Sequence, residues 1–179
     1  ELEALARRTA WNAERAWSEL ASELVPPRGV VDVVVADNAD YANGYATPFP
    51  SNRIVVYARP PVEELSLRNH RDWNRMVVTH ELTHVFHLDR TRGWWRVAQG
   101  VFGRAAPFFP NGYAPSWITE GLAVHYETRF GEEGGRLAGT EFRSLVRAAA
   151  LDGSLPALDA LSLAQPHFPR GNVAYLYGS

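Results

Sequence analysis

The sequence predicts an α+β fold. Its 179 residues are enough to bury a sizeable core, and 46% apolar with 21% charged residues is typical of a globular protein. A helical pattern comes first, two β-branched runs follow, and mostly helical patterns fill the remainder, an order that favours α+β over alternating strands and helices. We expect one domain over 1–179, with an N-terminal lobe over about 1–90 and a mostly helical lobe over about 91–179.

The N-terminal third is predicted to hold one helix and two strands. Residues 2–24 show helical periodicity, closed by Pro26-Pro27. The runs 30–36 and 53–58 are rich in β-branched residues, as in strands, whereas 37–52 between them is dense in Asn, Gly and Pro, as in loops. The core positions expected on the helix are Leu5, Trp17, Leu20 and Leu24.

Three further helices are predicted. One spans about Asp72 to Arg90, the next begins after Ser116 as N-cap and runs to about Phe130, and the third covers about 139–151. The segment between the first two looks irregular and apolar. The last residues, 172-NVAYLYGS-179, stop inside an apolar pattern without a cap or charged tail. We therefore expect the helical lobe to be truncated at this point, and the natural chain to continue and to include further domains.

Composition bounds the possible partners. A net charge of −2 gives no general electrostatic attraction to nucleic acid or to an anionic membrane. No apolar run approaches the length of a membrane span. Because the chain has no cysteine, any metal would have to be held by imidazole and carboxylate groups.

The segment 80-HELTH-84 is the candidate metal site. A helix places His80 and His84 on one face, one turn apart, where both imidazoles can bind one Zn²⁺. Glu81 can then reach a metal-bound water as general base. The alternative is an amphipathic helix that carries these residues by chance. Apolar neighbours such as Val77 and Phe86 favour the metal site, because solvated histidines would not need a buried setting.

A catalytic zinc site needs a third protein ligand and one open position. The continuation xxGxxH would supply a third histidine, but here those two positions hold His87 and Arg90. The candidate is Glu120 in 116-SWITEGLA-123, with Glu127, two turns later, as the weaker alternative. Taken alone, Glu120 could equally be a first-turn glutamate that the helix dipole favours. A fourth protein ligand at His87 would close the site, so we expect His87 beside the site or exposed.

Together, 80-HELTH-84 and 117-WITEGLA-123 resemble the gluzincin superfamily of zinc metallopeptidases, which includes thermolysin and the aminopeptidase N relatives. The resemblance implies a zincin-like fold: a small mixed sheet with an edge strand over the cleft, and an active-site helix carrying HELTH. It implies His80, His84 and Glu120 as zinc ligands and Glu81 as general base. The likeness is greatest to bacterial peptidase domains that are sometimes fused to a β-propeller. In that fold 53-RIVVYA-58 would be the edge strand that binds peptide, and an ordinary sheet strand is the alternative.

Two further segments bear on the resemblance. The aminopeptidase branch has a YxxG segment whose tyrosine stabilises the oxyanion, and 175-YLYG-178 resembles it, which implies this role for Tyr175. A core tyrosine is the alternative, and His167 is a weaker substitute. The GxMEN segment that binds a free amino terminus is absent, since Met76 is the only methionine. An endopeptidase is therefore expected.

These expectations combine into zinc-dependent hydrolysis of peptide bonds in a peptide or protein substrate, in an extracytoplasmic or cell-envelope location. Two alternatives stay open: a degenerate binding module with a structural zinc, and a zinc hydrolase of a small ester or amide. The apolar insertion 93–115 would be a lid or specificity wall over the cleft, or it would pack in the core or against the rest of the chain. Its aromatic residues include Trp94, Trp95, Phe102, Phe108 and Phe109.

Overall fold

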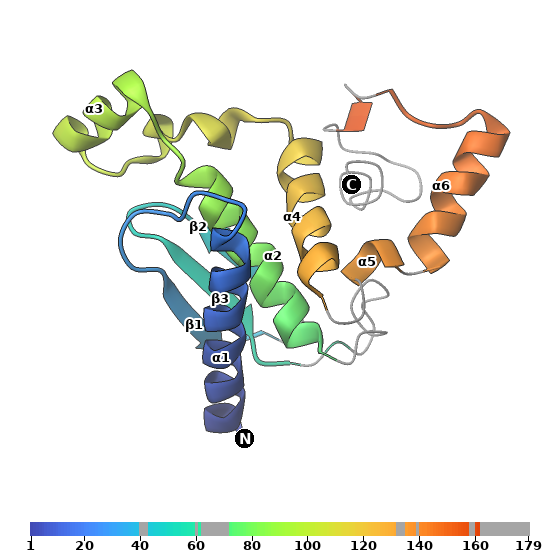
Figure 1. Ribbon diagram of the computed structural model, residues 1–179, viewed down its shortest axis with the longest axis horizontal. Helices are drawn as coiled ribbons and strands as arrows, with labels where there is room; N and C mark the ends of the chain where they lie inside the picture. The colour runs from blue at the N-terminus through green and yellow to red at the C-terminus, as the bar shows by residue number, and fades with distance from the viewer. Residues whose placement is uncertain are drawn as a thin grey trace. The chain divides into compact units, whose positions relative to one another are not determined.

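The structure, a computed structural model, describes residues 1–39, 43–59, 61, 72–131, 135–138, 140–157 and 160–161. Within these residues it contains six α-helices and one three-stranded mixed sheet, so the α+β class is confirmed (Figure 1). The chain divides into two compact units, Glu1–Tyr113 and Ala114–Ser179. None of the described helices has the length and apolarity that crossing a membrane requires.

The first unit contains the sheet and three of the helices. Both strands predicted for this region are present, and so are the helices predicted near 2–24 and 72–90. In chain order its elements are α1 (Leu2–Ala21), β1 (Asp32–Ala36), β2 (Gly44–Thr47), β3 (Arg53–Tyr57), α2 (Trp73–Leu88), α3 (Gly93–Phe102) and the 3-10 turns η1 (Ala106–Phe108) and η2 (Pro110–Tyr113).

The strand order in the sheet is β1-β3-β2, with β3 parallel to β1 and antiparallel to β2. Because β3 is the central strand, the expectation that residues 53–58 form an edge strand is wrong. The strand β2 lies inside the stretch expected to be a loop. It is only four residues long, and Asn43 and Pro48 border it, so the turn-forming neighbours conceal a segment too short to show alternation.

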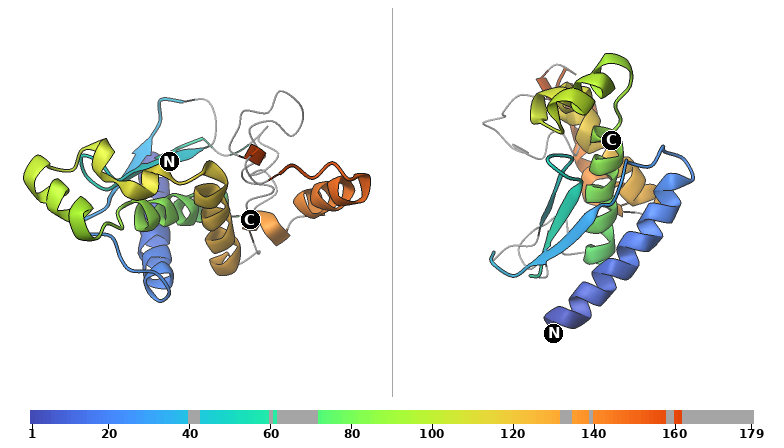
Figure 2. Two further views of the ribbon diagram at one scale, coloured as in Figure 1. Left: turned by 90° about the horizontal axis from the view of Figure 1, so that it is seen from above. Right: turned by 90° about the vertical axis from the view of Figure 1, so that its left-hand side faces the viewer.

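Helices α1 and α2 cover one face of the sheet (Figure 2). The register places Gly44 opposite Val56 and Ala46 opposite Ile54, and these side chains share the face toward the helices. Ile54 and Val56 are fully buried there. On the opposite face, Tyr45 remains 49% exposed. The helix-facing side of β2 therefore carries only small side chains, which lets α2 lie close to it.

Small and polar residues line the contact between α1 and α2. Leu20 is fully buried as predicted, whereas the other three expected core residues are only half-buried. Asn12 donates from Nδ2 to Oδ1 of Asn74 at 2.8 Å, and Asn74 donates from Nδ2 to Oγ1 of Thr9 at 2.9 Å. All three side chains are buried, so these bonds satisfy groups that water cannot reach. Buried Arg75 adds an ion pair to Glu19 at 2.6 Å.

Helix α2 is the central helix of this unit. Asp72 is its N-cap, and the Asp72 side chain accepts a hydrogen bond from the backbone N–H of Arg75 at 3.0 Å. This bond satisfies one of the N–H groups that have no partner within the first turn of a helix. Twelve of its sixteen residues are buried, including polar ones on every side. The helix that carries HELTH is therefore held on several faces, which fixes the direction of its histidines.

The second unit contains α4 (Ser116–Phe130), α5 (Gly135–Ala138) and α6 (Thr140–Asp152). The helices predicted near 116–130 and 139–151 are confirmed. Ser116 is the first helical residue and not the N-cap, so that expectation is wrong: extended Pro115 occupies the cap position and provides no side-chain hydrogen bond. Helix α5 begins close to α4, since a β-carbon on Gly135 would lie 2.7 Å from the Cα of Thr128.

Candidate metal centre

His80 and His84 lie on one face of α2, as the spacing predicts. Their Nε2 atoms are 3.1 Å apart, and the rings meet edge to face with centroids 4.8 Å apart. His80 is buried and His84 is half-buried. Two nitrogens at this separation can hydrogen-bond to each other if one carries a proton, and two unprotonated nitrogens can bind one cation.

The separation fits a metal. A tetrahedral zinc ion with Zn–N bonds of about 2.0–2.1 Å holds two nitrogens about 3.3 Å apart, close to the 3.1 Å between these two Nε2 atoms. The rings need only a small rotation to reach that value. The histidines therefore fit a shared ion without rearrangement of the backbone of α2.

Glu120 lies in the second turn of α4 and is half-buried. Among the described residues, His80, His84 and Glu120 are those that could hold a metal ion, and each offers one ligand atom. The weaker alternative, Glu127, is fully buried and pairs with Arg136 of α5 at 3.5 Å. Glu127 does not belong to the group of possible ligands.

Glu81 is 6% exposed and lies directly after His80 on α2. The sheet limits its position. A β-carbon on Gly44 of β2 would lie 3.0 Å from Cγ of Glu81, 2.9 Å from Cγ1 of Val77 and 2.9 Å from the carbonyl oxygen of Val55. Only glycine leaves room for this approach, so β2 and the candidate general base are in direct contact. The sequence offered one signal for this contact, an isolated glycine in a strand-length segment, which the loop prediction obscured.

His87 lies one turn beyond His84. His87 was expected either beside the site or exposed. It is half-buried, so the expectation of an exposed side chain is wrong. Burial lowers the pKa of His87 below its usual value, and the nearby His84 lowers it further. Its buried Nδ1 has no hydrogen-bond partner among the described residues, and its backbone oxygen accepts a bond from Nδ2 of Asn111 at 2.7 Å. His87 is not one of the possible ligands found among the described residues.

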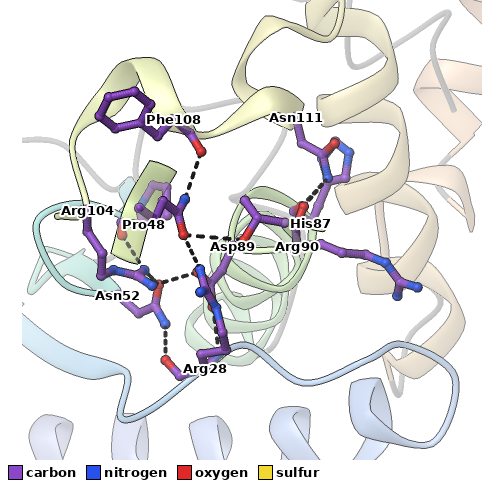
Figure 3. Close-up of polar contacts among 11 residues, drawn as sticks. Arg28, Pro48, Asn52, His87, Asp89, Arg90, Arg104, Phe108 and Asn111 are labelled. Carbon is purple, nitrogen blue, oxygen red and sulfur yellow. Dashed lines mark hydrogen bonds and ion pairs between the residues drawn. The ribbon is translucent and has the colours of Figure 1, made fainter. Parts of the chain in front are cut away.

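A buried ionic cluster holds the C-terminal end of α2 (Figure 3). Asp89 is fully enclosed and accepts bonds from the backbone N–H of Arg28 at 2.6 Å, from Nη2 of Arg28 at 3.0 Å and from Nη1 of Arg104 at 2.8 Å. Arg28 also donates to Gln99, and Arg104 donates to the side chain of Asn52. The bonds that Asp89 accepts therefore come from two arginines, and no local pattern in the sequence predicts either partner.

The insertion 93–115 is more regular than expected, since it contains α3 and two 3-10 turns. The prediction of core packing is confirmed for Phe109, which is 2% exposed and whose ring centroid lies 5.8 Å from that of Phe49. The same prediction is wrong for Trp94, Trp95 and Phe102, which are all exposed. The alternatives of a lid over the cleft and of contact with more of the chain stay predictions.

Two residues considered in the sequence lie outside the described residues. They are Tyr175, the expected oxyanion donor, and its substitute His167. The role of Tyr175 accordingly stays a prediction.

Comparisons with known proteins add no family assignment. A scan against family models, a search of curated proteins and a search of solved structures each found no match.

Proposed function

We propose that this chain is a gluzincin-type zinc metallopeptidase with a zincin-like fold. In this proposal His80, His84 and Glu120 hold the ion and Glu81 is the general base. One observation carries it: the Nε2 atoms of His80 and His84 converge to 3.1 Å on a buried helix. Glu120 offers the third ligand atom that the segment 117-WITEGLA-123 implies.

The donor set favours zinc. Two imidazoles and one carboxylate are the ligands of a well-known class of catalytic zinc sites, and three protein ligands leave the fourth position open for substrate or water. Zinc bound there would polarise a substrate carbonyl and lower the pKa of a water molecule. A structural zinc would need neither an open position nor a neighbouring base, so Glu81 favours an enzyme over a binding module.

The role proposed for Glu81 is proton transfer. It follows His80 directly, and contact with Gly44 restricts where its carboxylate can go. We infer that Glu81 takes the proton of the attacking water and delivers it to the leaving amine. Tyr175 would donate its phenol proton in a hydrogen bond to the developing oxyanion.

The edge strand of the proposed cleft is β2 and not the strand expected from the sequence. Among the described strands, β2 pairs with β3 alone, so its other edge has backbone groups that an extended peptide can pair with. Because β2 touches Glu81, a peptide bound along it would run past the general base. We therefore propose internal peptide bonds as the substrate.

The test is cleavage of a mixed peptide library by the zinc-loaded full chain, followed by mass spectrometry, for the wild type and Glu81→Gln. We expect internal cleavage by the wild type, and a loss of about 10²-fold or more in Glu81→Gln at unchanged zinc content. Undiminished turnover in Glu81→Gln would remove Glu81 from the mechanism. Zinc binding without cleavage of any peptide would favour the binding module, and hydrolysis restricted to small esters or amides would favour the small-molecule hydrolase.

A further inference from the structure

Helix α3 exposes more apolar surface than a solvated helix should. Of its ten residues only Ala98 and Gln99 are buried. Trp94 is 75% exposed, Val101 70% and Phe102 68%. Contiguous exposed apolar side chains of this size mark interaction surfaces in soluble domains.

The exposed residues form a stripe. Trp94, Val97 and Val101 recur at helical spacing, so they lie along one side of α3, and all three are exposed. Arg92 and Arg96, both exposed, lie on the other side of the outward surface. Gly100 lies between the two groups and has no side chain, so the surface is shallower between the apolar residues and the arginines.

The helix is firmly attached below this surface. Gln99 donates from Nε2 to the carbonyl of Phe108 at 2.8 Å, and its Oε1 accepts bonds from Arg28 and Thr91. In Figure 1, α3 projects from the end of α2, away from the N-terminus of α1. The apolar stripe therefore lies on a helix that hydrogen bonds hold to the rest of the first unit.

The charge around the stripe has one sign. Between Asp89 and Glu120 the chain contains no acidic residue, although it carries −2 overall. The basic residues of this segment are Arg90, Arg92, Arg96 and Arg104, of which the first three are exposed. An apolar stripe flanked by arginines matches a partner that has an apolar layer beneath a negatively charged surface.

We propose that α3 is an interfacial helix that docks this protein on an anionic phospholipid surface. Tryptophan and branched aliphatic side chains would enter the boundary between headgroups and acyl chains, and the arginines would contact lipid phosphates. The absence of acidic residues from 90–119 favours an anionic lipid surface, whose charge is uniformly negative, over a second protein. The proposal does not depend on the metal site.

The test is sedimentation of the full chain with vesicles of phosphatidylcholine mixed with phosphatidylglycerol, and with vesicles of phosphatidylcholine alone. We expect binding to the anionic vesicles that high salt weakens, and little binding to the neutral ones. Trp94→Ala should weaken binding about tenfold, and Arg92→Gln with Arg96→Gln by at least as much.

Matched controls exist elsewhere in the unit. Trp11 on α1 is 59% exposed, and Arg7 and Arg53 are exposed cations, so Trp11→Ala and Arg7→Gln with Arg53→Gln should leave vesicle binding unchanged. Equal circular dichroism of each variant and the wild type would show that it is folded.

Three results would overturn the proposal. These are no binding to either kind of vesicle, binding that Trp94→Ala and Trp11→Ala weaken equally, and self-association in analytical ultracentrifugation that Trp94→Ala abolishes without any vesicle binding. The last result would assign the stripe to an interface between copies of the chain. Quenching of tryptophan fluorescence by brominated lipid, lost in Trp94→Phe and kept in Trp11→Phe, would support insertion of Trp94 directly.

Discussion

Gly44 of β2 touches Glu81 of α2 so closely that no larger residue fits without movement. An added β-carbon would lie 3.0 Å from Cγ of Glu81 and 2.9 Å from the carbonyl oxygen of Val55. The second neighbour is backbone in the central strand and cannot rotate away. The glycine therefore sets the distance between the sheet and the candidate general base.

Gly44→Ala should disturb the site without removing any chemical group. We expect a stability loss of roughly 1–3 kcal/mol and a fall in peptide cleavage, because either β2 or Glu81 must shift. Zinc content should stay the same, since no ligand changes. Gly112→Ala is the matched control, because a β-carbon there meets nothing within 4 Å. Full activity in Gly44→Ala would mean that the contact with β2 does not position Glu81.

Glu120 can be tested as a ligand by zinc content. Glu120→Ala should lower zinc per chain after dialysis, since two imidazoles remain, and should reduce the rise in melting temperature that zinc gives the wild type. The control is Glu127→Gln, which keeps a hydrogen-bonding side chain beside Arg136. Full zinc occupancy in Glu120→Ala would assign the third ligand to another residue and break the gluzincin proposal.

Asp89 should be essential for the stability of the first unit. Asp89→Asn leaves Arg28 and Arg104 without their shared buried anion, which should cost about 3–5 kcal/mol. The melting temperature should fall by on the order of 10 °C. By contrast, Asp32→Asn breaks an exposed pair with Arg53, where each side chain is about half exposed, and should change stability by less than about 1 kcal/mol. Similar melting temperatures for the two variants would contradict this assignment.

Long periodic patterns predicted their elements well. The helix over Trp73–Leu88 and the helix over Ser116–Phe130 were predicted to within two residues, because apolar spacing and the HELTH motif agree there. The histidine pair followed directly, since helical geometry alone brings residues four apart onto one face.

The missed elements are those whose sequence carries a conflicting signal. The strand Gly44–Thr47 is stabilised by pairing with β3, the next strand along the chain, and its own composition favours a turn. Helix Gly93–Phe102 begins with Gly93 and contains Gly100, and glycine disfavours helices, so the segment has the composition of an irregular stretch. The cluster at Asp89 joins residues 61 and 15 positions away in the chain, which no local pattern reveals.

Tyr175 gives the most specific test of the resemblance to the aminopeptidase branch. If its phenol hydrogen-bonds to the oxyanion, Tyr175→Phe should lower kcat by about 10²–10³-fold, because that bond forms only in the transition state. KM and zinc content should change little. Tyr177→Phe, two residues further in the same 175-YLYG-178 segment, is the matched control and should retain activity. If Tyr177→Phe loses kcat and Tyr175→Phe does not, the other tyrosine of the segment is the donor. If neither variant loses kcat while Glu81→Gln remains inactive, the stabilising donor lies elsewhere and the likeness to the YxxG segment carries no function.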